Sequence, residues 1–326
     1  MRPTRRTWLR HILFLLITFV TATIAGTIEP FGRLPIFPEL VDGTAPDSFL
    51  VLLYLPEYYG NLVAKALILL ATDPPTLFAS LSFSVPLLII LTAHEAGHYV
   101  ACRIYRVHAT LPYFIPTPPL IGPAGTFGAF IRILAPMPSR KAVFDIGVAG
   151  PIAGFVALIP VSVIALLTVT EPTPEVAESL RAQLYFADPL YMQGMAWLLG
   201  VNLSHSITNG FYFATWMGLL VTALNLIPAG QLDGGHANYA IFGPLVHKWT
   251  GVAAFVLMST FALAGYWFFN SPSGFLIAVL LGVMLRVGHP RPLTTEPLDM
   301  KRKLVAILTL LIFVVCFAPF PIRLAY

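Results

Sequence analysis

The sequence has 326 residues, of which 57% are hydrophobic and only 10% are charged, and its formal net charge is +4. A soluble domain carries about 25% charged residues, so this chain lacks the side chains needed to cover a surface that faces water. The composition therefore predicts an integral membrane protein whose partner is the lipid bilayer. The small net charge argues against a nucleic-acid partner.

Seven apolar segments are long enough to be membrane spans, which need roughly 20 apolar residues each. They cover residues 11–28, 77–101, 143–169, 210–229, 250–269, 274–288 and 303–322. Four arginines precede the first segment, which favours an uncleaved span with a cytoplasmic N-terminus over a signal peptide. The absence of a serine-rich transit extension favours a prokaryotic inner membrane. Segment 49–71 contains Pro56, Glu57 and Lys65, and we expect an interfacial or re-entrant helix there.

The charge distribution supports this layout. Loops 103–142 and 286–303 are basic, whereas loop 170–208 is acidic. If segment 49–71 does not cross the membrane, both basic loops lie on the same side as the basic N-terminus, as the positive-inside rule requires. We expect Asp145, next to the first basic loop, to pair with Arg140 or Lys141.

The fold class predicted is an all-α polytopic membrane protein with about seven transmembrane helices. Its three parts are an N-terminal span with an interfacial segment (1–76), a catalytic core (77–236) and C-terminal spans (237–326). Prolines cluster in residues 112–123 among aromatic and aliphatic residues. Such a loop cannot lie bare in hydrocarbon, so it must pack on protein or line a wet cavity.

The clearest local signal for chemistry is His94-Glu95-Ala96-Gly97-His98, an HExxH sequence at the end of an apolar run. Residues four apart share one face of a helix, so both imidazoles can bind one Zn²⁺ while Glu95 takes a proton from the zinc-bound water. The alternative is a polar helix end at the membrane interface. Ionisable groups at this depth are costly and usually functional, which favours the metal site.

A catalytic zinc ion uses three protein ligands and one open position, so a third ligand must come from elsewhere in the chain. Asp233 closes a later apolar span that we expect to end on the cytoplasmic side, where the layout also places His94 and His98. The rival is His236, three residues further on. His205 is expected on the opposite side.

Asn225 lies eight residues before Asp233, within the same predicted span. An amide in hydrocarbon needs hydrogen-bond partners. We expect it to bind the substrate backbone or to steady the oxyanion near the zinc, and the alternative is a contact between helices. Pro228, Gly230 and the glycine pair 234–235 predict a break in the helix, which is tolerated at membrane depth where the chain lines a cavity.

These two motifs, HEAGH at 94–98 and NLIPAGQLDGG at 225–235, resemble the signatures of the site-2 protease family of intramembrane zinc metalloproteases. Residues 147–154 are similar to that family's glycine-rich intervening span, and segment 125–133 most resembles the plastid and cyanobacterial subgroup. The resemblance implies a three-helix catalytic core. It also implies a transmembrane protein substrate that another protease has already cleaved.

In that family a strand-forming segment between the first two core spans lies near the active site and can pair with an unwound substrate. The resemblance places this role on Gly125, Thr126, Phe127 and Gly128. The residues agree independently, because segment 125–133 is rich in β-forming side chains and its glycines permit a hairpin. The alternative is a structural hairpin that plugs the cytoplasmic mouth.

The function hypothesis is therefore an intramembrane zinc metalloprotease that hydrolyses membrane-spanning proteins near the cytoplasmic side. Two other classes were considered. A non-proteolytic scaffold or chaperone would not need the complete set of ligands and base. A transporter with a structural metal would be expected to show internal repeats, which this sequence lacks. The sequence indicates neither the natural substrate nor the oligomeric state.

Overall fold

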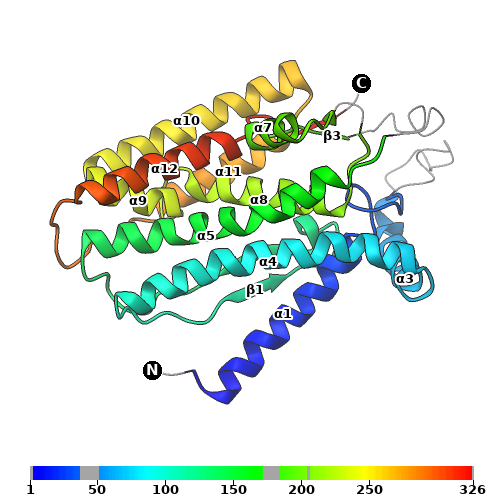
Figure 1. Cartoon of the computed structure of the whole chain (residues 1–326), viewed down its shortest axis with the longest axis horizontal. Coiled ribbons are helices and arrows are strands. Elements are labelled where there is room, and N and C mark those ends of the chain that lie inside the picture. The colour runs from blue at the N-terminus through cyan, green and yellow to red at the C-terminus, as the bar shows by residue number, and fades with distance from the viewer. Residues whose placement is uncertain (1–2, 37–50, 172–183, 204–205, 325–326) are drawn as a thin grey trace.

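The computed structural model describes residues 3–36, 51–171, 184–203 and 206–324, and most of these are helical. Figure 1 shows the long helices lying side by side along the longest axis of the molecule. The helices are α1 (Arg5–Ala25), α3 (Val51–Thr72), α4 (Pro74–Ile104), α5 (Arg140–Leu167), α7 (Leu190–Leu199), α8 (Gly210–Leu226), α9 (Asp233–Phe242), α10 (Pro244–Phe269), α11 (Ser273–Arg286) and α12 (Met300–Cys316).

Each predicted apolar segment coincides with a helix in this set. Helices α1, α4, α5 and α10 are long and apolar enough to cross a membrane, and α8 and α11 are shorter apolar helices. The chain is thus a helical protein with several candidate membrane spans, and the count of seven spans stays a prediction. Segment 49–71 corresponds to α3, which lies at one end of the bundle beside the start of α4 (Figure 1).

Side-chain caps explain where two of the core helices begin. The carboxylate of Asp73 accepts a hydrogen bond from the backbone N–H of Thr76 at 3.1 Å, and prolines occupy the first turn of α4. The hydroxyl of Ser139 accepts from the backbone N–H of Ala142 at 3.1 Å at the start of α5. Both are N-cap arrangements that satisfy otherwise unpaired backbone donors.

Helices α4 and α5 pack closely because small residues meet where they cross. A Cβ atom added to Gly97 of α4 would lie 2.3 Å from the carbonyl oxygen of Ala149 in α5. Small residues let helix backbones approach in this way inside membranes. Helix α8 completes the core, which is filled by fully buried side chains: Phe83, Leu87, Leu158, Trp216 and Leu219.

A two-stranded antiparallel hairpin connects α4 to α5. Strand β1 (Tyr113–Pro116) pairs with β2 (Thr126–Phe130), and a short 3₁₀ turn (Pro123–Gly125) precedes β2. The hairpin packs on α1, because Thr21 donates a hydrogen bond to the carbonyl of Gly125 at 2.7 Å and His11 Nδ1 lies 2.8 Å from the carbonyl of Pro112. The chain thus packs on α1 at both ends of the proline-rich segment, which is one of the two predicted arrangements, while Leu120 and Ile121 within the segment are exposed.

The structure corrects the predicted pairing of Asp145. This carboxylate accepts two hydrogen bonds from Arg302 of α12, at 2.9 Å from Nε and 2.6 Å from Nη2, and a third from the hydroxyl of Tyr105. Arg140 instead donates to the carbonyls of Ala240 and Ile241 at the end of α9. The prediction was wrong because a helix residue on the packed face meets its neighbours in space rather than those next to it in sequence.

Loop 170–208 also contains regular structure that the sequence analysis did not predict. Its described part includes strand β3 (Leu184–Phe186) and helix α7. Strand β3 pairs with β4 (Ile322–Leu324), so Tyr185 lies opposite Arg323. The acidic residues Glu175 and Glu178, together with His205, lie outside the described residues.

Candidate metal centre

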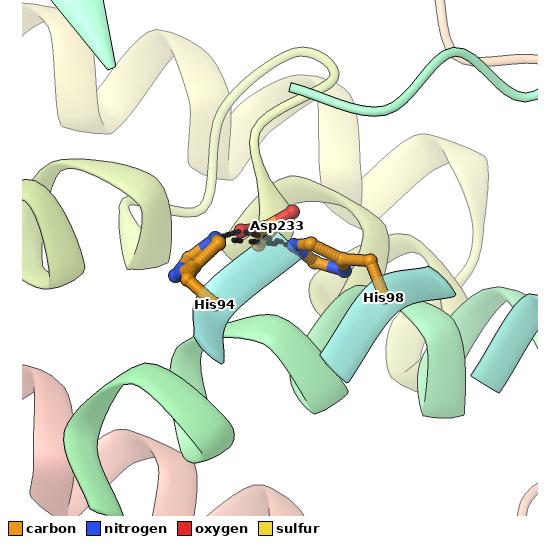
Figure 2. Close-up of side chains that lie close together, drawn as sticks. All are labelled: His94, His98 and Asp233. Atoms are coloured by element: carbon orange, nitrogen blue, oxygen red, sulfur yellow. Dashed lines mark hydrogen bonds and ion pairs between the residues drawn. The ribbon is translucent and has the colours of Figure 1, made fainter. Parts of the chain in front are cut away.

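Three side chains from two helices converge inside the bundle, as Figure 2 shows. His94 and His98 lie one turn apart on α4, and Asp233 is the first residue of α9. The Asp233 Oδ2 atom lies 3.2 Å from His94 Nε2 and 3.2 Å from His98 Nε2, and the two Nε2 atoms are 3.1 Å apart. Residues 139 positions apart in sequence thus form one cluster.

This geometry fits a tetrahedral zinc ion. Ligand atoms placed 2.0–2.1 Å from zinc at tetrahedral angles are roughly 3.3 Å from one another. The three separations observed here are 3.1 to 3.2 Å, close to that value. Within the described residues, this is the group of His, Cys, Asp and Glu side chains that could hold a metal ion. Three protein ligands leave a fourth position for water or substrate, which is the pattern of catalytic zinc sites.

The orientation of His98 is set by α5. Its Nδ1 lies 2.6 Å from the carbonyl oxygen of Ile146. A carbonyl only accepts, so Nδ1 carries the hydrogen and donates it, and the lone pair of the neutral ring is left on Nε2. Metal-binding histidines are usually held by such a hydrogen bond, which fixes the tautomer and the ring plane.

Glycines of α5 make room for both imidazoles. A Cβ atom on Gly150 would lie 2.1 Å from His98 Nε2, and one on Gly154 would lie 3.2 Å from the Cβ of His94. The first distance is far inside van der Waals contact, so any side chain at position 150 would displace the ring. The space that the ligands occupy therefore explains Gly150 and Gly154, whereas a Cβ atom on Gly147 would lie 2.9 Å from the Cβ of His236.

Glu95 follows His94 and is buried, with its Oε1 atom 4.0 Å from His94 Nε2. The backbone N–H of Ile131 faces its carboxylate as a hydrogen-bond donor. Ile131 directly follows β2, so the hairpin reaches the predicted base through its backbone. Ile131 belongs to the predicted strand-forming segment 125–133, but no sequence signal places it in the site, because a backbone donor has no residue signature.

The helix break predicted before Asp233 is present, but Asp233 lies on a different helix from the one expected. Asp233 does not close a span; α8 ends at Leu226 and Asp233 starts the separate helix α9. A Cβ atom on Gly234 would lie 2.0 Å from the carbonyl oxygen of Leu226. The first glycine of the pair therefore lets α9 start directly against the end of α8, which brings the carboxylate back toward α4.

Asn225, in the last turn of α8, lies beside the metal ligands. Its Nδ2 is 3.4 Å from His94 Nε2. The structure thus places the amide next to one of the ligands. An amide here can donate to an oxygen atom of a bound group.

The four hairpin residues predicted to bind substrate occupy different environments. Gly125 has a φ of +71° and is bonded to α1, and Thr126 is buried with its hydroxyl donating to the Ile115 carbonyl at 2.9 Å. Phe127 is 61% exposed, and Gly128 donates its backbone N–H to the Thr126 hydroxyl. The hairpin is therefore anchored at its turn side and exposes an apolar ring further along.

His236, the rival third ligand, is not part of the converging group and bonds to another histidine instead. Its Nδ1 lies 2.7 Å from Nε2 of His289 in the loop before α12. His289 stacks on Tyr239 with ring centroids 4.0 Å apart, and its Nδ1 donates to the Pro290 carbonyl at 2.7 Å. This pair ties α9 to the loop after α11, and no sequence motif had indicated it.

Comparison with known proteins decides the family. The family model described as "Peptidase family M50" matches residues 82–266, which include all three ligands and Glu95. The chain belongs to peptidase family M50. This membership confirms the predicted resemblance, because M50 is the site-2 protease family, and it identifies zinc as the metal for the site.

Several curated relatives of this M50 protein are plant proteins whose names also specify zinc. The chain is 31% identical over 201 residues to "Probable zinc metalloprotease EGY1, chloroplastic" of Arabidopsis thaliana, covering 59% of this chain and 35% of the relative. The Oryza sativa subsp. japonica EGY1 protein is 31% identical over 267 residues, covering 78% and 41%. The Oryza sativa subsp. indica EGY2 protein is 29% identical over 243 residues, covering 71% and 42%. The chain spans less than half the length of these relatives.

Proposed function

We propose that this M50 protein is a zinc-dependent endopeptidase that hydrolyses peptide bonds of membrane-spanning proteins. The observation that carries the proposal is the convergence of His94, His98 and Asp233 at tetrahedral spacing, with the buried carboxylate of Glu95 beside them. A structural metal site would not require a base next to an open position. Membership of a metalloprotease family supports the same conclusion.

His94, His98 and Asp233 would hold the zinc ion, which would supply polarisation of the scissile carbonyl and a lower pKa for the attacking water. Glu95 then acts as the general base. It takes the proton of that water and passes it to the leaving nitrogen. The backbone N–H of Ile131 faces the Glu95 carboxylate and favours its charged form. Asn225 donates its amide hydrogen to the substrate oxygen that becomes negatively charged, a role for which its position 3.4 Å from His94 Nε2 is suitable.

A transmembrane helix hides its peptide bonds in backbone hydrogen bonds, so the substrate must be extended before hydrolysis. We propose that the β1–β2 hairpin receives the extended segment by strand addition. The hairpin is suited to this role because its end reaches Glu95 through Ile131 and because strand β2 carries the exposed apolar ring of Phe127.

We further propose that cleavage occurs near the cytoplasmic face, in a prokaryotic inner membrane with the N-terminus inside. Basic residues support this orientation, since Arg140, Lys141 and Arg302 lie at the starts of α5 and α12. Both helix starts are at the end of the bundle where α4 ends (Figure 1). The substrate proposed is a single-span protein that another protease has already shortened.

The test is cleavage of a single-span reporter in liposomes by the purified protein and by Glu95→Gln. We expect the variant to retain zinc, because Glu95 is not a ligand, and to lose cleavage by about 10²–10⁴-fold. Glu57→Gln, an exposed carboxylate on α3, is the matched control and should cleave normally. Full activity of Glu95→Gln would refute the mechanism, and a wild-type protein that lacks stoichiometric zinc would favour a scaffold.

A further inference from the structure

A cavity of about 830 Å³ lies outside the metal centre, between the end of α10, the end of α12 and the β3–β4 pair. Its walls include Phe268 and Phe269 of α10 and Phe317 and Phe320 after α12. Figure 1 shows these elements at the end of the bundle near the C-terminus. The volume is within the 300–1,000 Å³ range of small-molecule sites.

One cation faces this cavity. The guanidinium carbon of Arg323 lies 5.1 Å from the ring centroid of Phe269 and 5.9 Å from that of Phe320, so the group is stacked on aromatic rings. Its Nε is buried and has no hydrogen-bond partner. Across the described ranges, the ion pairs do not include Arg323. A buried donor without a partner is costly, so the described residues leave the hydrogen-bonding capacity of this guanidinium partly unused.

The backbone holds Arg323 at this place. Strand β4 pairs with β3, and the N–H of Leu324 donates to the Asn270 carbonyl at 2.9 Å, directly after α10. Asp188 also lines the cavity, but its carboxylate accepts a hydrogen bond from Tyr212 of α8. Burial raises the pKa of Asp188 above its ordinary value.

The cavity lies at the end of a candidate membrane span. Helix α10 is a candidate span, and Phe269 is its last residue. Trp267 is 73% exposed and Phe268 is 77% exposed at the same end. Exposed aromatic rings at the end of a span are typical of the interface where lipid head groups lie.

We propose that this cavity binds an anionic membrane lipid, with the head-group phosphate on Arg323 and the glycerol and first methylene groups against the phenylalanine walls. Arginine suits a phosphate because its planar fork donates two parallel hydrogen bonds. The site lies apart from the metal centre and does not depend on the proposed protease activity.

The test uses the full-length protein, delipidated in a neutral detergent and titrated with phosphatidylglycerol, phosphatidylcholine of the same acyl chains, or glycerol phosphate. Bound lipid is counted by native mass spectrometry. We expect phosphatidylglycerol to bind more tightly than phosphatidylcholine and Arg323→Gln to weaken phosphatidylglycerol binding about tenfold or more. Arg33→Gln, an exposed arginine between α1 and α3, is the matched control and should leave binding unchanged.

Arg323→Lys keeps the charge without the fork and should give an intermediate affinity, which keeps the test valid if the glutamine variant does not fold. Equal affinity of wild type and both Arg323 variants for phosphatidylglycerol would overturn the proposal. So would binding of glycerol phosphate as tight as that of the whole lipid, which would indicate a free phosphate site. Arg323-dependent binding of a peptide carboxylate in place of the lipid would also overturn it.

Discussion

Substitution of Gly150 by alanine tests the metal centre without changing a ligand or the base. The added Cβ would lie 2.1 Å from His98 Nε2 and 2.4 to 2.5 Å from two ring carbons. Ordinary contacts of this kind are about 3.4 Å or longer. The imidazole must therefore move by about 1 Å, although its Nδ1 is bonded to the Ile146 carbonyl at 2.6 Å.

The expected loss of metal affinity follows from these distances. A zinc site tolerates deviations of about 0.2 Å in its metal–ligand distances, several times smaller than the required shift. Replacing groups that merely orient a ligand costs about 10–100-fold in metal affinity, so Gly150→Ala should cost at least that much. Overpacking should also lower the stability by about 1–3 kcal/mol. The better helix propensity of alanine offsets about 1 kcal/mol of this loss.

The assay is zinc content after dialysis against a series of chelator concentrations, with thermal unfolding measured on the same samples. Gly154→Ala is a graded comparison, because its Cβ would lie 3.2 and 3.3 Å from His94 atoms and the ring need shift by only a few tenths of an ångström. Gly194→Ala in α7 is the control, since nothing lies within 4 Å of its added Cβ. Wild-type zinc affinity in Gly150→Ala would refute the geometry.

Three further substitutions test other parts of the structure. Asn225→Ala should retain zinc and lower kcat by about 10²–10³-fold; a change in KM alone, measured with the liposome reporter, would argue against oxyanion stabilisation. Arg302→Gln should lower the free energy of unfolding by about 1–3 kcal/mol, because Asp145 loses two charge-assisted hydrogen bonds. A double-mutant cycle with Asp145→Asn that shows no coupling would contradict this. Gly125→Ala should reduce cleavage more than Gly128→Ala at unchanged zinc content. Both glycines have positive φ, but only the first would place a Cβ against Thr21, at 2.3 Å from its carbonyl. Equal cleavage by the two variants would show that the packing of the hairpin on α1 is not needed for activity.

The helices and the ligand set could be predicted from the sequence because their determinants are local. Apolar runs marked the helices, and the spacing of His94 and His98 defined half of the site. Asp233 is remote from the histidines in sequence, so it could be predicted as the third ligand only from the expected order and direction of the membrane spans. The structure places Asp233 with the histidines but at the start of a new helix, because the chain turns after Leu226. The exact path of such a turn depends on tertiary packing, which hydrophobic patterns do not encode.

Other features had no signal in the sequence. The partner of Asp145 is Arg302, and their pairing is set by the packing of α12 on α5 rather than by proximity along the chain. The donor that faces Glu95 is a backbone N–H, which every non-proline residue carries. The pair formed by His236 and His289 likewise depends on a loop folding back over α9. Side-chain chemistry can be inferred from residue types, whereas partners across the fold require the fold itself.

The link between Arg302 and Asp145 has a consequence for the order of biosynthesis. All three metal ligands have been made once residue 233 leaves the ribosome, whereas the arginine that fastens α12 to α5 comes later. At 5–20 residues per second, the roughly 70 intervening residues take several seconds to synthesise. The metal centre can thus assemble while the C-terminal helices are still absent and its surroundings are open. Helix α12 would then be the last to pack on α5, through Arg302 and Asp145.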